Sequence, residues 1–291
     1  MTFQGTMVAL VTPFRDDHVD WPALDRLVDF HLEAGTNALV PCGTTGESPT
    51  LSHEEHDRVI EAVVKQAGGR VPVIAGTGSN STTEALRLTL HAEHAGADAA
   101  LMVSPYYNKP TQEGLYQHFA RVAEKVKLPI ILYNIPGRCG VEIMPATIAR
   151  LRKAFGHIVA VKHATGRLDD ASELSTLCDI ALISGDDSMT LPLMAIGGVG
   201  VISVIANLIP AEAKALTDAA LAGDFATAAE HHRKLFGLGK NMLSLETNPI
   251  PIKTAMAMKG LIAEEFRLPL CPMSPGNRQK LEAILKDSGV L

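Results

Sequence analysis

The chain has 291 residues, of which 46% are apolar and 20% are charged, and its formal net charge is −6. This composition is typical of a globular protein with a large core and excludes a disordered or fibrous chain. The charge is spread along the sequence and no basic stretch interleaves with aromatic residues, so we expect no nucleic-acid partner.

Short apolar runs recur along the chain, with helix-like stretches between them. Most of these runs are apolar throughout, as expected for parallel strands that are buried on both faces. They predict eight strands. The runs are Met7–Val11, Ala38–Val40, Val71–Ala75, Ala99–Val103, Ile130–Tyr133, Ile158–Val161, Ala181–Ile183 and Val199–Val204.

The stretches between the runs carry helix signals. Asp20 stands before Pro22 and an apolar stripe that stops at Gly35, which predicts one helix there. Two further pairs have capping-box spacing and mark the starts of the next two helices. These pairs are Ser52 with Glu55, and Ser81 with Glu84.

Eight strands that alternate with helices favour a closed (β/α)8 TIM barrel, because consecutive crossovers share one hand. A doubly wound open sheet is the alternative. We predict a barrel over residues 1–209 and a C-terminal helical extension over residues 210–291, packed on the barrel because no linker-like stretch separates them. The helices expected in the extension are Ala211–Leu221, Phe225–Met242, Pro249–Lys259 and Pro275–Lys286.

The stretch Ser188–Ala211 has no charged residue and approaches the roughly 20 apolar residues of a membrane span. It contains Pro192, Gly197 and Gly198, so a short helix, a glycine turn and a buried strand explain it better, and we expect no membrane span. The four cysteines are too sparse for a disulfide framework. No charged-then-apolar leader opens the sequence, and we therefore expect a reducing cytoplasm.

Lys162 is the most informative residue if the fold is a barrel, since such active sites lie at the carboxyl ends of the strands. It closes the apolar run Ile158–Val161, where a charged ammonium is unfavourable and its pKa should fall. A neutral amine can form an imine with a ketone. Taken alone, a lysine that pairs with a carboxylate at the barrel mouth, or reaches the rim, is the more common case.

Four other side chains are expected near the same edge. Tyr133 ends the adjacent run, and its phenol can pass a proton to an aldehyde oxygen if Thr44 or Tyr107 orients it. The Gly43–Gly46 turn offers N–H groups and hydroxyls that suit a carboxylate. Arg138 could hold a second carboxylate with its planar fork. An aromatic residue at the barrel rim and a surface arginine are the ordinary alternatives.

Two histidine pairs, His53 with His56 and His91 with His94, have the helical spacing of metal ligands. No Cys, Asp or third His supplies a completing ligand at short range, and such pairs usually lie on a solvated helix face. No glycine-rich turn completes a nucleotide-binding fingerprint. We therefore expect no metal and no cofactor.

Three motifs, taken in this order, are highly specific for one family. They are Gly43–Glu47 (GTTGE), Tyr133–Arg138 (YNIPGR) and Val161–Gly166 (VKHATG). Together with Gly185–Asp187 and Asn248–Pro251 they resemble the dihydrodipicolinate synthase/N-acetylneuraminate lyase family over nearly the whole chain.

The resemblance implies that Lys162 forms a Schiff base with pyruvate, and that Thr44, Tyr133 and Tyr107 form a proton relay. Tyr107 would reach across a dimer interface, so the protein would be a homo-oligomer, typically a dimer of dimers. Thr44 would also bind the carboxylate of pyruvate. The further substrate-binding positions implied are Thr45, Gly185 and Ile202.

Within the family, an arginine at position 138 implies L-aspartate 4-semialdehyde as the second substrate, whose carboxylate Arg138 would hold. The enamine of pyruvate would attack the aldehyde, and the substrate's own amine would displace Lys162 to release 4-hydroxy-tetrahydrodipicolinate, on the route to diaminopimelate and lysine. One alternative is a lyase for N-acetylneuraminate or a 2-keto-3-deoxy sugar acid, which gives Arg138 no necessary role. Another is a ligand sensor without catalysis.

The resemblance also implies feedback inhibition by lysine at the dimer interface. Glu84 has a simpler explanation, because it completes a capping box with Ser81. His163 stands where relatives often have Glu, and strand alternation predicts that it points away from Lys162. The positions implied for the effector are Ser48, His53, His56, Asn80, Glu84 and Tyr106.

Overall fold

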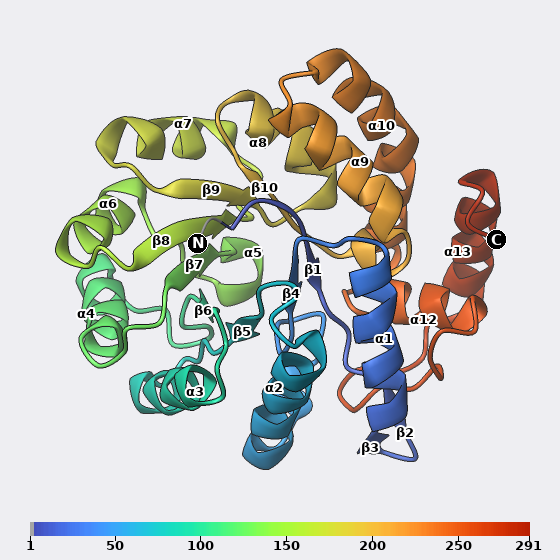
Figure 1. The fold of residues 1–291 in the computed structure, drawn as a ribbon, viewed down its shortest axis with the longest axis horizontal. Helices are drawn as coiled ribbons and strands as arrows, with labels where there is room; N and C mark the ends of the chain where they lie inside the picture. The colour runs from blue at the N-terminus through green and yellow to red at the C-terminus, as the bar shows by residue number, and fades with distance from the viewer. Residues whose placement is uncertain (1–2) are drawn as a thin grey trace.

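The computed structural model describes residues 3–291, and Figure 1 shows a central barrel of strands inside a ring of helices. The eight parallel strands follow the order β4-β1-β10-β9-β8-β7-β6-β5. A bridge between Leu39 and Val73 joins the two ends of this order, so the sheet closes. The strands are β1 Gly5–Ala9, β4 Ala38–Val40, β5 Ile74–Gly76, β6 Ala99–Val103, β7 Ile130–Asn134, β8 Ile158–His163, β9 Ala181–Ser184 and β10 Gly200–Ser203.

Closure confirms the predicted TIM barrel and makes the open-sheet alternative wrong. All eight predicted runs contain strands, although the first strand ends at Ala9 and not at Val11. There the chain leaves the sheet, and the Val11 N–H donates to the Asn207 side chain at 3.1 Å. A short hairpin follows that the sequence did not predict, because its strands have two residues each. They are β2 Phe14–Arg15 and β3 His18–Val19.

One main helix follows each barrel strand, as the alternating pattern predicts. Ser52 forms the predicted capping box with Glu55, since its hydroxyl accepts from the Glu55 N–H at 3.1 Å and the Glu55 carboxylate accepts from the Ser52 N–H at 2.9 Å. The helices are α1 Trp21–Glu33, α2 His53–Ala67, α3 Thr82–His94, α4 Gln112–Ala123, α6 Pro145–Ala154, α7 Leu168–Leu177, α8 Thr190–Ala195 and α9 Pro210–Leu221.

The second predicted capping box forms only in part. The Ser81 hydroxyl accepts from the Glu84 N–H at 3.4 Å, but the Glu84 carboxylate does not return to the Ser81 backbone. Instead it contacts the hydroxyl of Ser79 and the ring of His53. The position of the Glu84 carboxylate is therefore not explained by helix capping. The side chain instead lines a neighbouring pocket.

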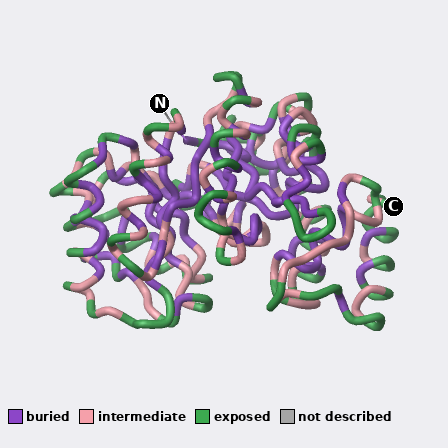
Figure 2. Tube along the Cα trace, turned by 90° about the horizontal axis from the view of Figure 1, so that it is seen from below, coloured by how far each residue is buried: buried purple, intermediate pink, exposed green. Residues whose placement is uncertain are grey.

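The core has two layers. Side chains that point into the barrel, among them Met7, Leu101 and Ile131, form one cluster, and a larger cluster lies between the strands and the helices. Figure 2 shows these buried segments in purple at the centre of the trace. This packing fixes the carboxyl ends of the strands, from which the candidate site is built.

The last part of the chain is helical, as expected. Its first helix, α9, packs on β1 and β10 and follows the eighth strand, so we propose that it belongs to the barrel and that the extension begins at about residue 225 rather than 210. The predicted helix Phe225–Met242 changes to a π-helical turn after Gly237. The elements are α10 Phe225–Gly237, η4 Leu238–Met242, α11 Leu243–Leu245, α12 Ile250–Met258 and α13 Pro275–Asp287.

The apolar stretch Ser188–Ala211 forms a short helix, a turn and a buried strand, as the sequence predicts. It contains α8, β10 and the 3-10 turn η3 Ile205–Asn207. Between residues 3 and 291, no helix combines the length and apolar character needed to cross a membrane.

Candidate active site

Lys162 lies in β8, near its carboxyl end, and only 5% of the residue is exposed. Its Nζ is 4.1 Å from the ring centre of Tyr133, which is its register partner in β7. Burial lowers the pKa of Lys162 to about 8, although the Asp186 and Asp187 carboxylates act in the opposite direction. The amine is therefore neutral in a much larger fraction of molecules than an exposed lysine would be at the same pH.

Tyr133 is also buried, with 6% of the residue exposed. Burial raises the pKa of its phenol above the ordinary value, and the nearby Arg138 guanidinium and Thr44 hydroxyl oppose this shift. The phenol therefore keeps its proton at neutral pH until a stronger base, such as an oxyanion, forms beside it.

A cavity of about 220 Å³ opens at the carboxyl ends of the strands beside Lys162. Gly185 leaves room for the lysine, because a Cβ at this position would lie 3.2 Å from the Lys162 Cε and 2.7 Å from the Ala164 Cβ. The cavity brings most of the predicted residues together. Its polar wall includes Thr44, Thr45, Tyr133, Arg138, Lys162, Asp186, Asp187, Thr247 and Asn248.

Asn248 connects the two predicted carboxylate-binding positions, a role that we did not predict. Its side-chain Nδ2 donates to the Thr45 hydroxyl at 3.0 Å, and its backbone carbonyl accepts from the Arg138 Nη2 at 3.2 Å. The only signal in the sequence was the motif Asn248–Pro251, which carried no chemistry of its own. The helical extension therefore supplies part of the wall of the barrel's cavity.

Two predicted residues lie outside this cavity in the single chain. Tyr107 is 90% exposed, and its backbone has a φ of 75°. Ile202 is fully buried in β10, within the cluster inside the barrel. Neither residue belongs to the cavity lining.

His163 follows Lys162 and points out of the barrel, in agreement with strand alternation. Its Nε2 lies 2.9 Å from the Arg167 carbonyl and 2.9 Å from the Thr165 hydroxyl. The residue lines a small space outside β8 and β9 and is not part of the lining of the Lys162 cavity, although Asp186 belongs to the walls of both. His163 therefore belongs to the outer wall of the barrel.

A second cavity of about 390 Å³ adjoins the first, and the two share Thr44, Tyr133 and Arg138 in their walls. Five of the six predicted effector residues line it. Asn80 does not, and its carbonyl instead accepts from the Asn108 side chain at 2.9 Å. The five lining residues are Ser48, His53, His56, Glu84 and Tyr106.

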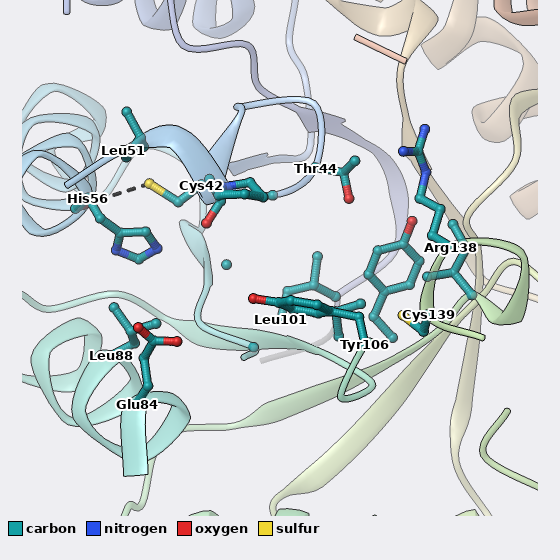
Figure 3. Close-up of a pocket in the computed structure, with 18 of the residues that line it drawn as sticks. Cys42, Thr44, Leu51, His56, Glu84, Leu88, Leu101, Tyr106, Arg138 and Cys139 are labelled. Atoms are coloured by element: carbon teal, nitrogen blue, oxygen red, sulfur yellow. Dashed lines mark hydrogen bonds between the residues drawn. The ribbon is translucent and has the colours of Figure 1, made fainter. Parts of the chain in front are cut away.

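Two polar side chains of this second cavity, His56 and Glu84, differ in how they are paired. His56 is 3% exposed, and neither ring nitrogen has a hydrogen-bond partner among residues 3–291. Burial lowers its pKa to about 4, so the ring is neutral. Hydrogen bonds from Ser79 and from His53, the latter at 2.7 Å, lower the pKa of Glu84 and keep it ionised. Figure 3 shows the His56 ring and the Tyr106 hydroxyl facing the same space, with Glu84 beside them.

A lysine whose charged form is disfavoured at the mouth of a closed barrel is suited to chemistry through a Schiff base, and the chain is an aldolase-type lyase of that class. A model of the dihydrodipicolinate synthetase family matches residues 2–288. A 4-hydroxy-tetrahydrodipicolinate synthase from Geotalea uraniireducens is 55% identical over 291 residues, covering 99% of this chain and 100% of the relative. The chain belongs to the dihydrodipicolinate synthetase family, which confirms the resemblance carried by its motifs.

Two solved structures are similar over the whole fold. A chloride-inhibited dihydrodipicolinate synthase from Acinetobacter baumannii, complexed with pyruvate, is 47% identical with a TM-score of 0.97, and the match covers 100% of both chains. The enzyme from Cyanidioschyzon merolae with lysine bound is 37% identical with a TM-score of 0.96, and the match covers 99% of both chains.

Proposed function

We propose that the chain condenses pyruvate with L-aspartate 4-semialdehyde to form 4-hydroxy-tetrahydrodipicolinate, in the cytoplasm, on the route to diaminopimelate and lysine. The observation that carries the proposal is the cavity around Lys162, in which an imine-forming amine shares one wall lining with Thr44, Thr45 and Arg138. Each of these positions suits one carboxylate, and each substrate carries one. The printed name of the similar synthase and the pyruvate bound in the Acinetobacter structure support the assignment.

In this mechanism Lys162 adds to the keto carbon of pyruvate, and loss of water gives the Schiff base. Loss of a methyl proton gives the enamine, whose carbon attacks the aldehyde carbon of the second substrate. The aldehyde oxygen takes a proton from Tyr133, which the raised pKa of the phenol has kept in place. The amine of the second substrate then displaces Lys162 and closes the ring.

We assign the proton relay to Thr44, Tyr133 and Tyr107, with Tyr107 acting in the site of a second copy of the chain. Its 90% exposure in the single chain supports a position in an interface, and we propose a homo-oligomer built as a dimer of dimers. The test mixes subunits that carry Tyr107→Phe with subunits that carry Lys162→Ala. Each parent should be almost inactive, and partial activity should return in the mixture, because one site of the mixed dimer has both groups. A mixture as inactive as its parents contradicts the shared relay.

The test of the reaction is condensation of pyruvate with L-aspartate 4-semialdehyde in an assay coupled to a reductase. Replacing Arg138 by alanine should lower kcat/KM for the aldehyde by about 10- to 100-fold, since hydrogen bonds to charged groups are worth about 1.5–3 kcal/mol. Pyruvate should still be trapped on Lys162 by borohydride in this variant, and not in Lys162→Ala. Cleavage of a sugar acid without condensation, unaffected by Arg138→Ala, would move the chain to the lyase alternative. A chain that traps no pyruvate would be a sensor.

We also propose that free lysine binds the second cavity and inhibits the enzyme. The ionised Glu84 carboxylate suits an ammonium group, and the unpartnered His56 nitrogens suit a polar ligand. The lysine bound in the Cyanidioschyzon structure supports this proposal. Inhibition by lysine should weaken in Glu84→Gln and stay unchanged in Glu113→Gln, a surface carboxylate that pairs with Arg150. Turnover that is insensitive to lysine in the unmodified chain would refute the regulatory role and leave the reaction in place.

A further inference from the structure

Asp186 lies in the wall of the Lys162 cavity, and none of the steps above uses it. The backbone of this residue is fixed, because its carbonyl accepts from the Ser184 hydroxyl at 2.8 Å and its N–H donates to the same oxygen at 3.3 Å. Its carboxylate, in contrast, makes no hydrogen bond with any residue of the described chain, 3–291. A rigid backbone thus presents a free carboxylate to the cavity.

The neighbouring Asp187 shows that the free carboxylate is not a general property of this turn. Its Oδ1 accepts from the Ser203 hydroxyl at 2.5 Å, and its Oδ2 accepts from the N–H groups of Val204 at 3.0 Å and Ile205 at 3.2 Å. These bonds tie the end of β9 to the end of β10. Asp187 therefore joins the ends of two strands at the barrel mouth, whereas the Asp186 carboxylate has no hydrogen-bond partner among residues 3–291.

The charges around Asp186 indicate which ligand group it would face. The cationic side chains that act on it are Lys162, Lys240 and Arg138, and the ring of His163 acts from the outer wall. Lys162 becomes a neutral amine and then a Schiff base during the reaction, and Arg138 is assigned to the carboxylate of the second substrate. That substrate carries its ammonium on the carbon next to this carboxylate, so the ammonium must lie close to Arg138. Asp186 is the cavity carboxylate left to receive it.

We propose that Asp186 binds the ammonium group of the amine-bearing aldehyde and takes up its proton before ring closure, an inference that rests on the proposed condensation. The ammonium gives one proton to Asp186 and becomes a nucleophilic amine. The amine nitrogen forms a bond to the Schiff-base carbon, its two remaining protons pass to the Lys162 nitrogen, and the bond between that nitrogen and the carbon breaks. The proton that the enamine attack left on the Schiff-base nitrogen passes to the Tyr133 phenolate, so Lys162 leaves as a neutral amine, the ring imine forms, and Asp186 returns its proton to solvent.

The surroundings of Asp186 suit this task. Burial raises the pKa of its carboxyl group above the ordinary value, while the nearby Lys162 and Lys240 ammonium groups counteract the shift. A carboxylate with a raised pKa is a better proton acceptor than an exposed aspartate.

The experiment compares Asp186→Asn with the unmodified enzyme on two aldehydes, L-aspartate 4-semialdehyde and succinic semialdehyde, which has the same carboxylate and no amine. With the first aldehyde, steady-state turnover should fall at least 10-fold, and borohydride quenching should trap the pyruvate–aldehyde adduct on Lys162, where the unmodified enzyme shows little. With succinic semialdehyde, the variant should form its adduct as fast as the unmodified enzyme. Arg138→Gln, the matched control, should lose adduct formation with both aldehydes.

Each other result has one meaning. An equal loss with both aldehydes, or loss of the pyruvate Schiff base itself, shows that Asp186 acts through Lys162 or the fold and overturns the proposal. Unchanged turnover of the amine-bearing aldehyde overturns it as well. An unmodified enzyme that fails to condense L-aspartate 4-semialdehyde overturns the proposed function, which distinguishes that failure from the failure of Asp186 alone.

Discussion

Replacing Lys162 by methionine is expected to stabilise the folded chain while abolishing its chemistry. Folding lowers the pKa of this lysine from 10.5 to about 8, chiefly by burial. Each tenfold change in an ionisation constant is worth about 1.4 kcal/mol, so the charged lysine destabilises the fold by about 3 kcal/mol at neutral pH. Methionine has a similar shape and no charge, and Asp186 and Asp187 then lose a favourable neighbour, so the net gain should be about 2–3 kcal/mol.

The pH dependence of the free energy of unfolding tests whether the buried charge of Lys162 causes the difference in stability. Between pH 8 and 10.5 the unfolded chain binds a proton at Lys162 that the folded chain does not, so the stability of the unmodified protein rises with pH across this window. Below pH 8 the buried charge of Lys162 destabilises the fold in full, and above pH 10.5 this destabilisation is gone. The advantage of Lys162→Met should therefore be largest at pH 7 and should shrink towards pH 10.

The assay is urea unfolding of the unmodified protein and of Lys162→Met at pH 7 and pH 10. Lys125→Met, which removes an exposed lysine, is the control and should change the free energy of unfolding by less than about 0.5 kcal/mol. A variant that is no more stable than the unmodified protein at pH 7, or that gains equally at both pH values, refutes the reasoning. The rate of Schiff-base formation with pyruvate should also rise with pH and level off near pH 8 in the unmodified enzyme.

Three further outcomes test how the site is supported. Lys253→Met should lower the free energy of unfolding by about 3–5 kcal/mol, because the buried Glu47 carboxylate loses the ammonium 2.5 Å away and keeps only the Arg267 N–H at 3.2 Å. In chemical unfolding, a double variant with Glu47→Leu should lose less stability than the two single variants lose together. Gly185→Ala should slow pyruvate trapping severely, since the new Cβ would lie 3.2 Å from the Lys162 Cε, and mass spectrometry after borohydride checks it. Asn248→Ala should raise the KM of pyruvate in the coupled assay more than it lowers kcat, because it frees the Thr45 hydroxyl, whereas Arg138 keeps its bond to the backbone carbonyl at position 248.

The sequence predicted the parts of the site that follow from strand geometry. Lys162 and Tyr133 end neighbouring strands and are register partners, so a barrel must bring them together at its carboxyl edge. Strand geometry could not predict contacts in which a side chain has more than one possible hydrogen-bond partner. Glu84 has capping-box spacing, yet its carboxylate turns to His53, because the sequence does not tell which of two nearby partners a side chain takes. The hydrogen bond between Asn248 and Thr45 joins residues that are 203 positions apart in the sequence, and no local sequence pattern predicts such a contact.

The same contacts explain why the helical extension belongs to the catalytic unit. The loop that would bind the pyruvate carboxylate is held at Thr45 by Asn248 and at Glu47 by the buried Lys253, and both partners lie beyond residue 225. Arg138, the other carboxylate-binding residue, also donates a hydrogen bond to the Asn248 carbonyl. A barrel without the extension would keep its buried lysine, because β8 packs among strands of the barrel itself. It would lose the positions of both carboxylate-binding groups, so imine chemistry could persist while recognition of the substrates fails.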